Sequence, residues 1–205
     1  FNVTIENRGG YLARLCDKYV GDFASPDFTV AVSDDDLSND PIKHPSKSYA
    51  ESVIACRKLA YMLPEKDAFL LHAATFEVKG RGIAFLAKSG TGKSTHTGLW
   101  QKVFGERAQI LNDDKPAIRA LSDGVFAYGT PWSGKTPCYK NEVLPLKASV
   151  RLSQAPHNII RKLPALQAYA SLMPACSCMR WDSTSNAKPR CFLTARQQSH
   201  QPTLA

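Results

Sequence analysis

The chain has 205 residues, enough for one large domain or for a core with a small subdomain. Its 43% hydrophobic and 21% charged residues are typical of soluble globular proteins, and it has no run of about 18 apolar residues, which excludes a typical membrane-spanning helix. Residues 151–205 hold +6 of the net charge of +8, so the evenly basic face of a nucleic-acid-binding protein is not expected.

The first residues favour a cytoplasmic protein, and the cysteines show no pattern of a metal site. Residues 1–6 alternate like a strand and do not resemble a signal peptide. Cys176 and Cys178 lack a second pair at zinc-finger spacing, so a zinc site is not expected. Cys16, Cys56 and Cys138 are isolated and are predicted to be buried or neutral thiols. We therefore expect a cytoplasmic location and no disulfides.

Residues 1–65 are predicted to form an N-terminal β-rich portion that ends in a helix. Residues 1–5 alternate, and residues 28–32 are apolar and β-branched, as in short strands. The acidic triplet at 34–36 predicts a loop, in which the triplet is a solvated turn or a helix cap. Residues 48–63 repeat apolar side chains with the helical period, and a proline follows them.

Residues 66–150 are predicted to form the core. They begin with an apolar run at 68–74 and a hairpin whose second strand, 82–86, leads into a glycine-rich segment. A helix should then reach residue 104, with Leu99, Trp100 and Val103 on its inner side. The rest of the core is predicted as a strand at 108–112, a hairpin over 117–128, a loop at 129–135 and a strand within 142–152.

Residues 151–205 are predicted to hold a helical segment and a poorly ordered basic tail. The helix lies within 159–173 and is interrupted near Pro164, and the tail covers 182–205, where polar residues dominate without an apolar period. The whole pattern predicts an α/β fold with a mixed sheet around the helix that follows the glycine-rich segment, and with the N-terminal β-rich portion packed against it.

The segment with the clearest chemical meaning is residues 87–95, which we call the glycine loop. It reads Ala-Lys-Ser-Gly-Thr-Gly-Lys-Ser-Thr and resembles a phosphate-binding (Walker A) loop between a strand and a helix, except that Ala87 replaces the first glycine. Glycines let backbone amides surround a polyphosphate, and the helix start favours anions. We expect a nucleotide on Ser89, Gly90, Thr91, Gly92, Lys93, Ser94 and Thr95.

Within that loop, Lys93 is expected to reach the β- and γ-phosphates, and the Ser94 hydroxyl to bind Mg²⁺. Two adjacent carboxylates, Asp113 and Asp114, follow Lys93 at the end of an apolar strand. Beside a phosphate loop, one of them can bind Mg²⁺ while the other orients and deprotonates an acceptor hydroxyl. A simple strand-end turn is the alternative interpretation of this pair.

These motifs resemble a known family. The stretch from Leu71-His72 through the glycine loop to Leu111-Asn112-Asp113-Asp114 is similar to the catalytic core of bacterial HPr serine kinase/phosphorylase, whose nucleotide-binding fold is shared by phosphoenolpyruvate carboxykinases. The closest likeness is to HPr-kinase-like proteins of bacterial peptide-modification clusters, which also have a Gly-Thr-Pro-Trp-Ser-Gly loop. The resemblance covers residues 49–150 and implies a mixed-sheet P-loop core of this type.

The resemblance also implies roles for individual residues. Lys93 and Ser94 would bind phosphate and Mg²⁺, Asp113 and Asp114 would be the metal and base carboxylates, and His72 would lie near the γ-phosphate. The signature segment that follows the Asp pair in HPr kinase is not found, so HPr is not the expected acceptor. The loop at 129–135 occupies that region.

Two residues of that loop, Trp132 and Lys135, are candidates for substrate contact. The alternatives are that Trp132 covers the core and that Lys135 meets only solvent.

The sequence thus predicts ATP- and Mg²⁺-dependent phosphoryl transfer to a hydroxyl, as by a serine kinase acting on a peptide or small protein. Two alternatives stay open: a catalytically silent nucleotide-binding switch or scaffold, and phosphoryl transfer of the carboxykinase type. The sequence leaves open the acceptor, the choice between ATP and GTP, and the oligomeric state.

Overall fold

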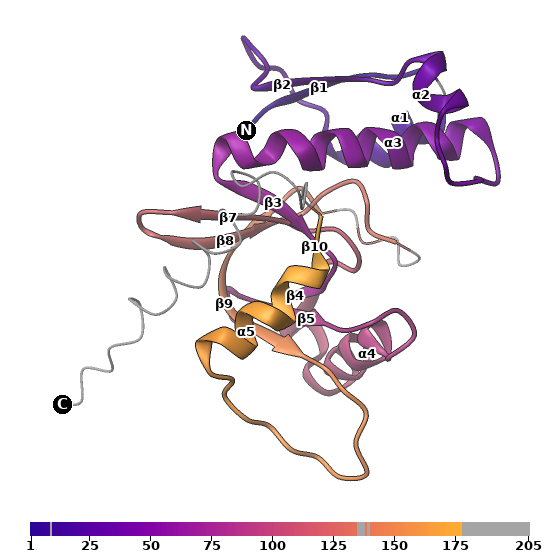
Figure 1. The fold of residues 1–205 in the computed structure, drawn as a ribbon. Helices are drawn as coiled ribbons and strands as arrows, with labels where there is room; N and C mark the ends of the chain where they lie inside the picture. Colours follow the sequence, from indigo (N-terminus) through magenta and orange to yellow (C-terminus); the bar gives the residue numbers. More distant parts are fainter. Residues whose placement is uncertain (9, 135–137, 139, 178–205) are drawn as a thin grey trace.

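The computed structural model describes residues 1–8, 10–134, 138 and 140–177. They form a mixed α/β fold, as predicted, with a two-stranded sheet and a larger eight-stranded sheet (Figure 1). Within these residues no helix combines the length and the apolar character needed to cross a membrane. The predicted tail, residues 182–205, lies outside the described residues.

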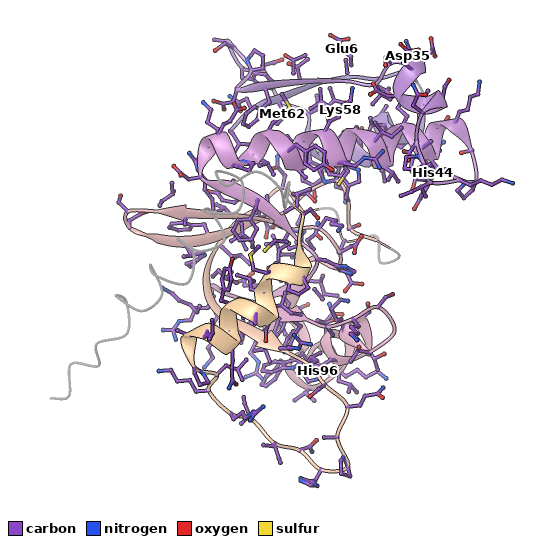
Figure 2. All side chains as sticks on the ribbon, in the orientation of Figure 1. Glu6, Asp35, His44, Lys58, Met62 and His96 are labelled. Carbon is purple, nitrogen blue, oxygen red and sulfur yellow. The ribbon has the colours of Figure 1, made fainter. Side chains whose placement is uncertain are left out.

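The N-terminal elements pack on one long helix, α3 (Lys47–Met62). Strands β1 (Val3–Glu6) and β2 (Phe28–Ala31) form a parallel pair connected through helix α1 (Gly10–Cys16). Lys58 and Met62 point from α3 toward this pair, whereas Glu6 points away from it (Figure 2). The strands and the helix predicted in residues 1–65 are present, but two further helices, α1 and α2, make this portion less β-rich than predicted.

The acidic triplet 34–36 lies in a short helix, α2 (Asp34–Ser38), and not in a loop. Ser33 caps it: its hydroxyl accepts a hydrogen bond from the backbone N–H of Asp36, whose side chain in turn accepts from the Ser33 N–H. This reciprocal cap satisfies two amides that a helix start would leave unpaired, which explains why so short a helix forms. The helix-cap interpretation was therefore the better of the two.

The eight-stranded sheet has the order β10-β3-β7-β8-β9-β5-β4-β6. Its hairpins are the predicted ones, β4 (Ala74–Val78) with β5 (Arg81–Leu86) and β7 (Ala117–Leu121) with β8 (Gly124–Tyr128). Strand β9 (Val143–Arg151) joins the two halves, because residues 143–145 pair with β8 and residues 146–151 pair in parallel with β5. The remaining strands are β3 (Ala68–Leu71), β6 (Ala108–Asn112) and β10 (Cys176–Ser177).

Strand β3 is buried on both faces and connects the two hydrophobic clusters of the molecule. Phe69 and Leu71 belong to a cluster inside the main sheet, whereas Ala68 and Leu70 pack with α3 and β2. Alternate side chains of a strand point to opposite faces, so one strand can contribute to both clusters. The N-terminal elements and the main sheet therefore share a continuous packed interior.

Helix α4 (Lys93–Phe104) follows the glycine loop, but its inner face differs from the predicted one. Leu99 and Val103 are 52% and 70% exposed, so their predicted burial is wrong. Trp100 does face inward, with its ring 5.0 Å from that of Phe76 on β4 and its indole N–H donated to the His96 ring. Of the three residues predicted on the inner side, only Trp100 therefore lies there.

The C-terminal helix is shorter than predicted. Helix α5 (Ala165–Leu172) begins directly after Pro164, and the preceding residues 159–164 are not helical. Proline fixes its own φ and disfavours the helical conformation in the residue before it, so it starts this helix and does not interrupt a longer one.

Replacing Trp100 by Ala tests the inner face of α4. The loss of a large packed ring should lower the free energy of unfolding by about 3 kcal/mol. Val103→Ala, on the exposed side, should change it by less than about 0.5 kcal/mol. Urea unfolding of the two variants and the parent measures both values, and similar losses for the two would contradict the assignment.

Candidate functional site

Three segments that are distant in sequence meet at one edge of the main sheet. Strand β4 runs antiparallel to both β5 and β6, so its start lies beside the ends of the other two. The glycine loop follows β5, the two aspartates follow β6, and His72 precedes β4. The strand topology therefore gathers the predicted site residues of all three segments at this edge.

Backbone conformation accounts for two glycines of the loop. Gly90 and Gly92 have φ values of +79° and +108°, in a region that L side chains rarely adopt. A Cβ on Gly90 would meet nothing within 4 Å, so conformation and not space requires glycine there. Ala87 has no positive φ, and its methyl group therefore imposes no left-handed strain.

The two loop residues expected to bind phosphate and metal both make side-chain hydrogen bonds. The Lys93 side chain, on a residue only 9% exposed, donates from Nζ to the Ala87 carbonyl oxygen at 3.1 Å. Ser94 donates its hydroxyl to Oδ2 of Asp113 at 2.9 Å, across 19 residues of sequence. This contact joins the glycine loop directly to the first of the two aspartates.

A completely buried amide, Asn112, shapes the turn that carries both aspartates. Its Oδ1 accepts hydrogen bonds from the backbone N–H groups of Asp114, at 2.9 Å, and Lys115, at 2.7 Å. Its Nδ2 donates to the carbonyl and hydroxyl oxygens of Thr130, each at 3.1 Å. All the polar atoms of the side chain are therefore used, as burial requires.

The turn directs the two aspartates to different partners. Asp113 is 7% exposed and receives the Ser94 hydroxyl. Asp114 is more exposed, and its Oδ1 lies 3.4 Å from Nε2 of His72. The pair therefore has one carboxylate beside the glycine loop and one beside the histidine, an arrangement in which two carboxylates can serve different roles.

The environment of His72 disfavours its charged form. Burial, and then the nearby Lys93 ammonium, lower the pKa of His72, while the Asp114 carboxylate raises it and Lys115 lowers it further. Neither lysine has an ion pair among the described residues; Lys115 Nζ donates to the Ser177 hydroxyl at 3.3 Å. The site thus combines two ammonium groups without ion pairs and a histidine that stays neutral at pH 7.

The loop after β8 approaches the site, but its tryptophan is used elsewhere. Trp132 donates its indole N–H to the carbonyl oxygen of Ser52 on α3 at 3.0 Å and packs against the α3 core. This favours the interpretation in which Trp132 covers the core. Gly134 lies against Asp114, because a Cβ there would be 2.9 Å from the Asp114 Cβ. The other candidate, Lys135, lies outside the described residues.

Sequence reasoning gave no role to two residues that build this site, Asn112 and Thr130. Asn112 appeared only as part of the Asn-Asp-Asp pattern, although asparagine before a turn commonly accepts hydrogen bonds from the amides that follow it. Thr130 had no such local signal, because its partners lie 15 and 18 residues earlier in the chain.

Two of the described cysteines, one on α3 and one after β8, have raised pKa values. Burial raises the pKa of Cys56 to about 12 and that of Cys138 above its ordinary value, so both thiols are neutral, as predicted. Across the described part of the chain, no three His, Cys, Asp or Glu side chains gather in a way that could hold a metal ion.

Neither the models of known protein families nor the curated proteins produce a match to this chain.

The charges around His72 make its titration a test of the site geometry. Lys93→Ala should raise the pKa of His72, because a nearby cation is removed, and Asp114→Asn should lower it, because a nearby anion is removed. NMR titration of the histidine ring protons measures both shifts. Shifts of the same sign, or none, would contradict the arrangement.

The same lowered pKa predicts a pH dependence of stability. Below the ordinary histidine pKa of about 6.5, the unfolded chain binds a proton that the folded chain does not. The contribution of His72 should therefore destabilise the fold as the pH falls through that value, and His72→Gln should remove this part of the loss.

Proposed function

We propose that this protein is a kinase that transfers a phosphoryl group from ATP to a hydroxyl, with a P-loop core of the HPr kinase type. The hydrogen bond from the Ser94 hydroxyl to Asp113 carries the proposal. In P-loop enzymes, a Ser or Thr of the loop and an Asp at a strand end together hold the Mg²⁺ of the nucleotide. Here the two groups meet at 2.9 Å beside the buried Lys93.

The donor set fits Mg²⁺ better than it fits metals that need many protein ligands. Mg²⁺ usually binds one or two carboxylates plus substrate phosphates and water. A hydroxyl and a carboxylate, from Ser94 and Asp113, meet that requirement without a larger cluster of ligands. When bound, Mg·ATP would supply the phosphoryl group, and the metal would neutralise charge on its oxygens.

The chain's own groups would orient the phosphates and accept a proton. Lys93 would exchange the Ala87 carbonyl for the β- and γ-phosphates, and the backbone N–H groups at the start of α4 would add further donors. Asp114, the more exposed carboxylate, would accept the proton of the acceptor hydroxyl. The neutral His72 beside it would hold that carboxylate in place without adding charge.

The acceptor is proposed to be a serine of a peptide or small protein, reached from the side of Asp114. A binding-only switch or scaffold would use the same glycine loop and would differ by lacking transfer. Carboxykinase-type transfer would need a carboxylic acid substrate. Incubation with γ-labelled ATP, Mg²⁺ and serine-containing peptides separates these functions, because label on a peptide supports the kinase and tight binding without transfer supports the switch.

The two aspartates should separate metal binding from proton transfer. Asp113→Asn and Asp114→Asn keep the side-chain shape, so ATP should still bind through Lys93 and the backbone amides. Transfer should fall by about 10²–10⁴ in each, the usual worth of a positioned base or metal ligand. Higher Mg²⁺, or Mn²⁺, should partly restore Asp113→Asn but not Asp114→Asn. If both variants turn over like the parent, the two aspartates have no catalytic role and form only a strand-end turn.

Lys93→Ala should weaken Mg·ATP binding by at least about tenfold and abolish transfer, because a buried ammonium at the phosphates is lost. Lys102→Ala is the matched control, since Lys102 lies exposed on the same helix. Calorimetry measures both affinities. Equal affinities for the two variants would contradict the assignment of the glycine loop as the nucleotide site.

A further inference from the structure

A tyrosine from the N-terminal portion reaches the loop that supports the candidate site. Tyr19 ends the short 3-10 helix η1 (Asp17–Tyr19), and its hydroxyl donates to the carbonyl oxygen of Thr130 at 2.8 Å. The Lys140 carbonyl oxygen lies 3.2 Å from the same hydroxyl. The Tyr19 hydroxyl therefore lies between two carbonyls from opposite ends of the loop that follows β8.

Other contacts bring the two ends of this loop together at the same point. The backbone N–H of Gly129 donates to the Glu142 carbonyl at 3.0 Å. A Cβ on Gly129 would lie 1.7 Å from the Lys140 carbonyl oxygen, so only glycine permits this close approach. Backbone contacts already hold the two ends of this loop together. Tyr19 adds a side-chain contact to them, from a position 111 residues before Thr130.

From Thr130 the hydrogen bonds continue to the aspartate turn. The carbonyl oxygen that receives the Tyr19 hydroxyl also accepts from Nδ2 of Asn112, and the Thr130 hydroxyl donates to the Lys115 carbonyl at 2.7 Å. Asn112 in turn holds the amides of Asp114 and Lys115. An unbroken series of hydrogen bonds therefore leads from Tyr19 to the backbone of Asp114.

We propose that Tyr19 is a positioning residue for Asp114. This proposal rests on the proposed kinase function, in which Asp114 accepts the hydroxyl proton. Tyr19 acts through Thr130 and Asn112: its hydroxyl fixes the Thr130 carbonyl, and Thr130 fixes the Asn112 amide that sets the direction of the turn. In a cooperative network of hydrogen bonds, the loss of one bond weakens the next one. Loss of the Tyr19 hydroxyl would therefore be felt at the Asp114 turn.

Tyr19→Phe tests the proposal, because it removes the hydroxyl and keeps the ring. Hydrogen exchange at the Asp114 and Lys115 amides should become about fivefold faster, since one neutral hydrogen bond is worth about 1 kcal/mol. The kcat of phosphoryl transfer should fall by about three- to tenfold, with the KM for ATP within about twofold of the parent. Tyr49→Phe is the matched control: Tyr49 lies exposed on α3, in ring contact with Tyr11 and His44.

Each outcome has one meaning. Faster exchange at the two amides together with a lower kcat supports the positioning role. Unchanged exchange overturns it, whatever the activity, and so does faster exchange with an unchanged kcat. An equal fall in kcat and in ATP affinity, or the same effects in Tyr49→Phe, would indicate general loosening and would also overturn it. If the parent itself transfers no phosphate, the kinase function fails and the positioning role fails with it, whereas the exchange data still report whether the network exists.

Discussion

The candidate site depends on the buried amide of Asn112. A polar group that is removed from water without a partner costs about 1–3 kcal/mol, so a side chain that is 0% exposed must have its hydrogen bonds satisfied by the protein. Asn112 satisfies them on two sides, with the Asp114 and Lys115 amides and with Thr130. A displacement of either side would leave buried donors or acceptors unpaired, and this penalty holds the turn and the loop in one arrangement.

That arrangement sets the electrostatics of the site. At His72 the Lys93 ammonium has a larger effect on the pKa than the Asp114 carboxylate, and Lys115 adds to it, so the summed effect of these three groups is that of a positive charge. Burial strengthens such interactions, because water screens them less. Burial, together with the two lysines, favours the neutral imidazole, so it can contact a carboxylate without forming a fixed ion pair with it.

Local patterns were sufficient for most elements and for the charged residues of the candidate site, but not for Thr130 or for the contacts between the elements. The hairpins, α3 and the strand before Asp113 follow from short-range periodicity. Strand β9 was predicted, but its pairing with β8 at one end and β5 at the other was not, because strand order depends on long-range contacts that periodicity does not contain. The inner face of α4 was misassigned for a related reason: Trp100 packs at a tilt against aromatic side chains of β4 and β5, whose position depends on the sheet.

The N-terminal portion shows why a division of the chain by composition differs from a division by contacts. The boundary predicted at residue 65 follows from a helix end and a change of pattern, yet α3 packs against β3 across it. Tyr19 and Trp132 strengthen the connection, since each is half-buried and donates its polar hydrogen to a backbone carbonyl on the other side of the boundary. Apolar packing alone would allow the two parts to shift relative to each other, whereas directed hydrogen bonds hold them in register. The loop beside Asp114 is therefore positioned by residues on both sides of the predicted boundary.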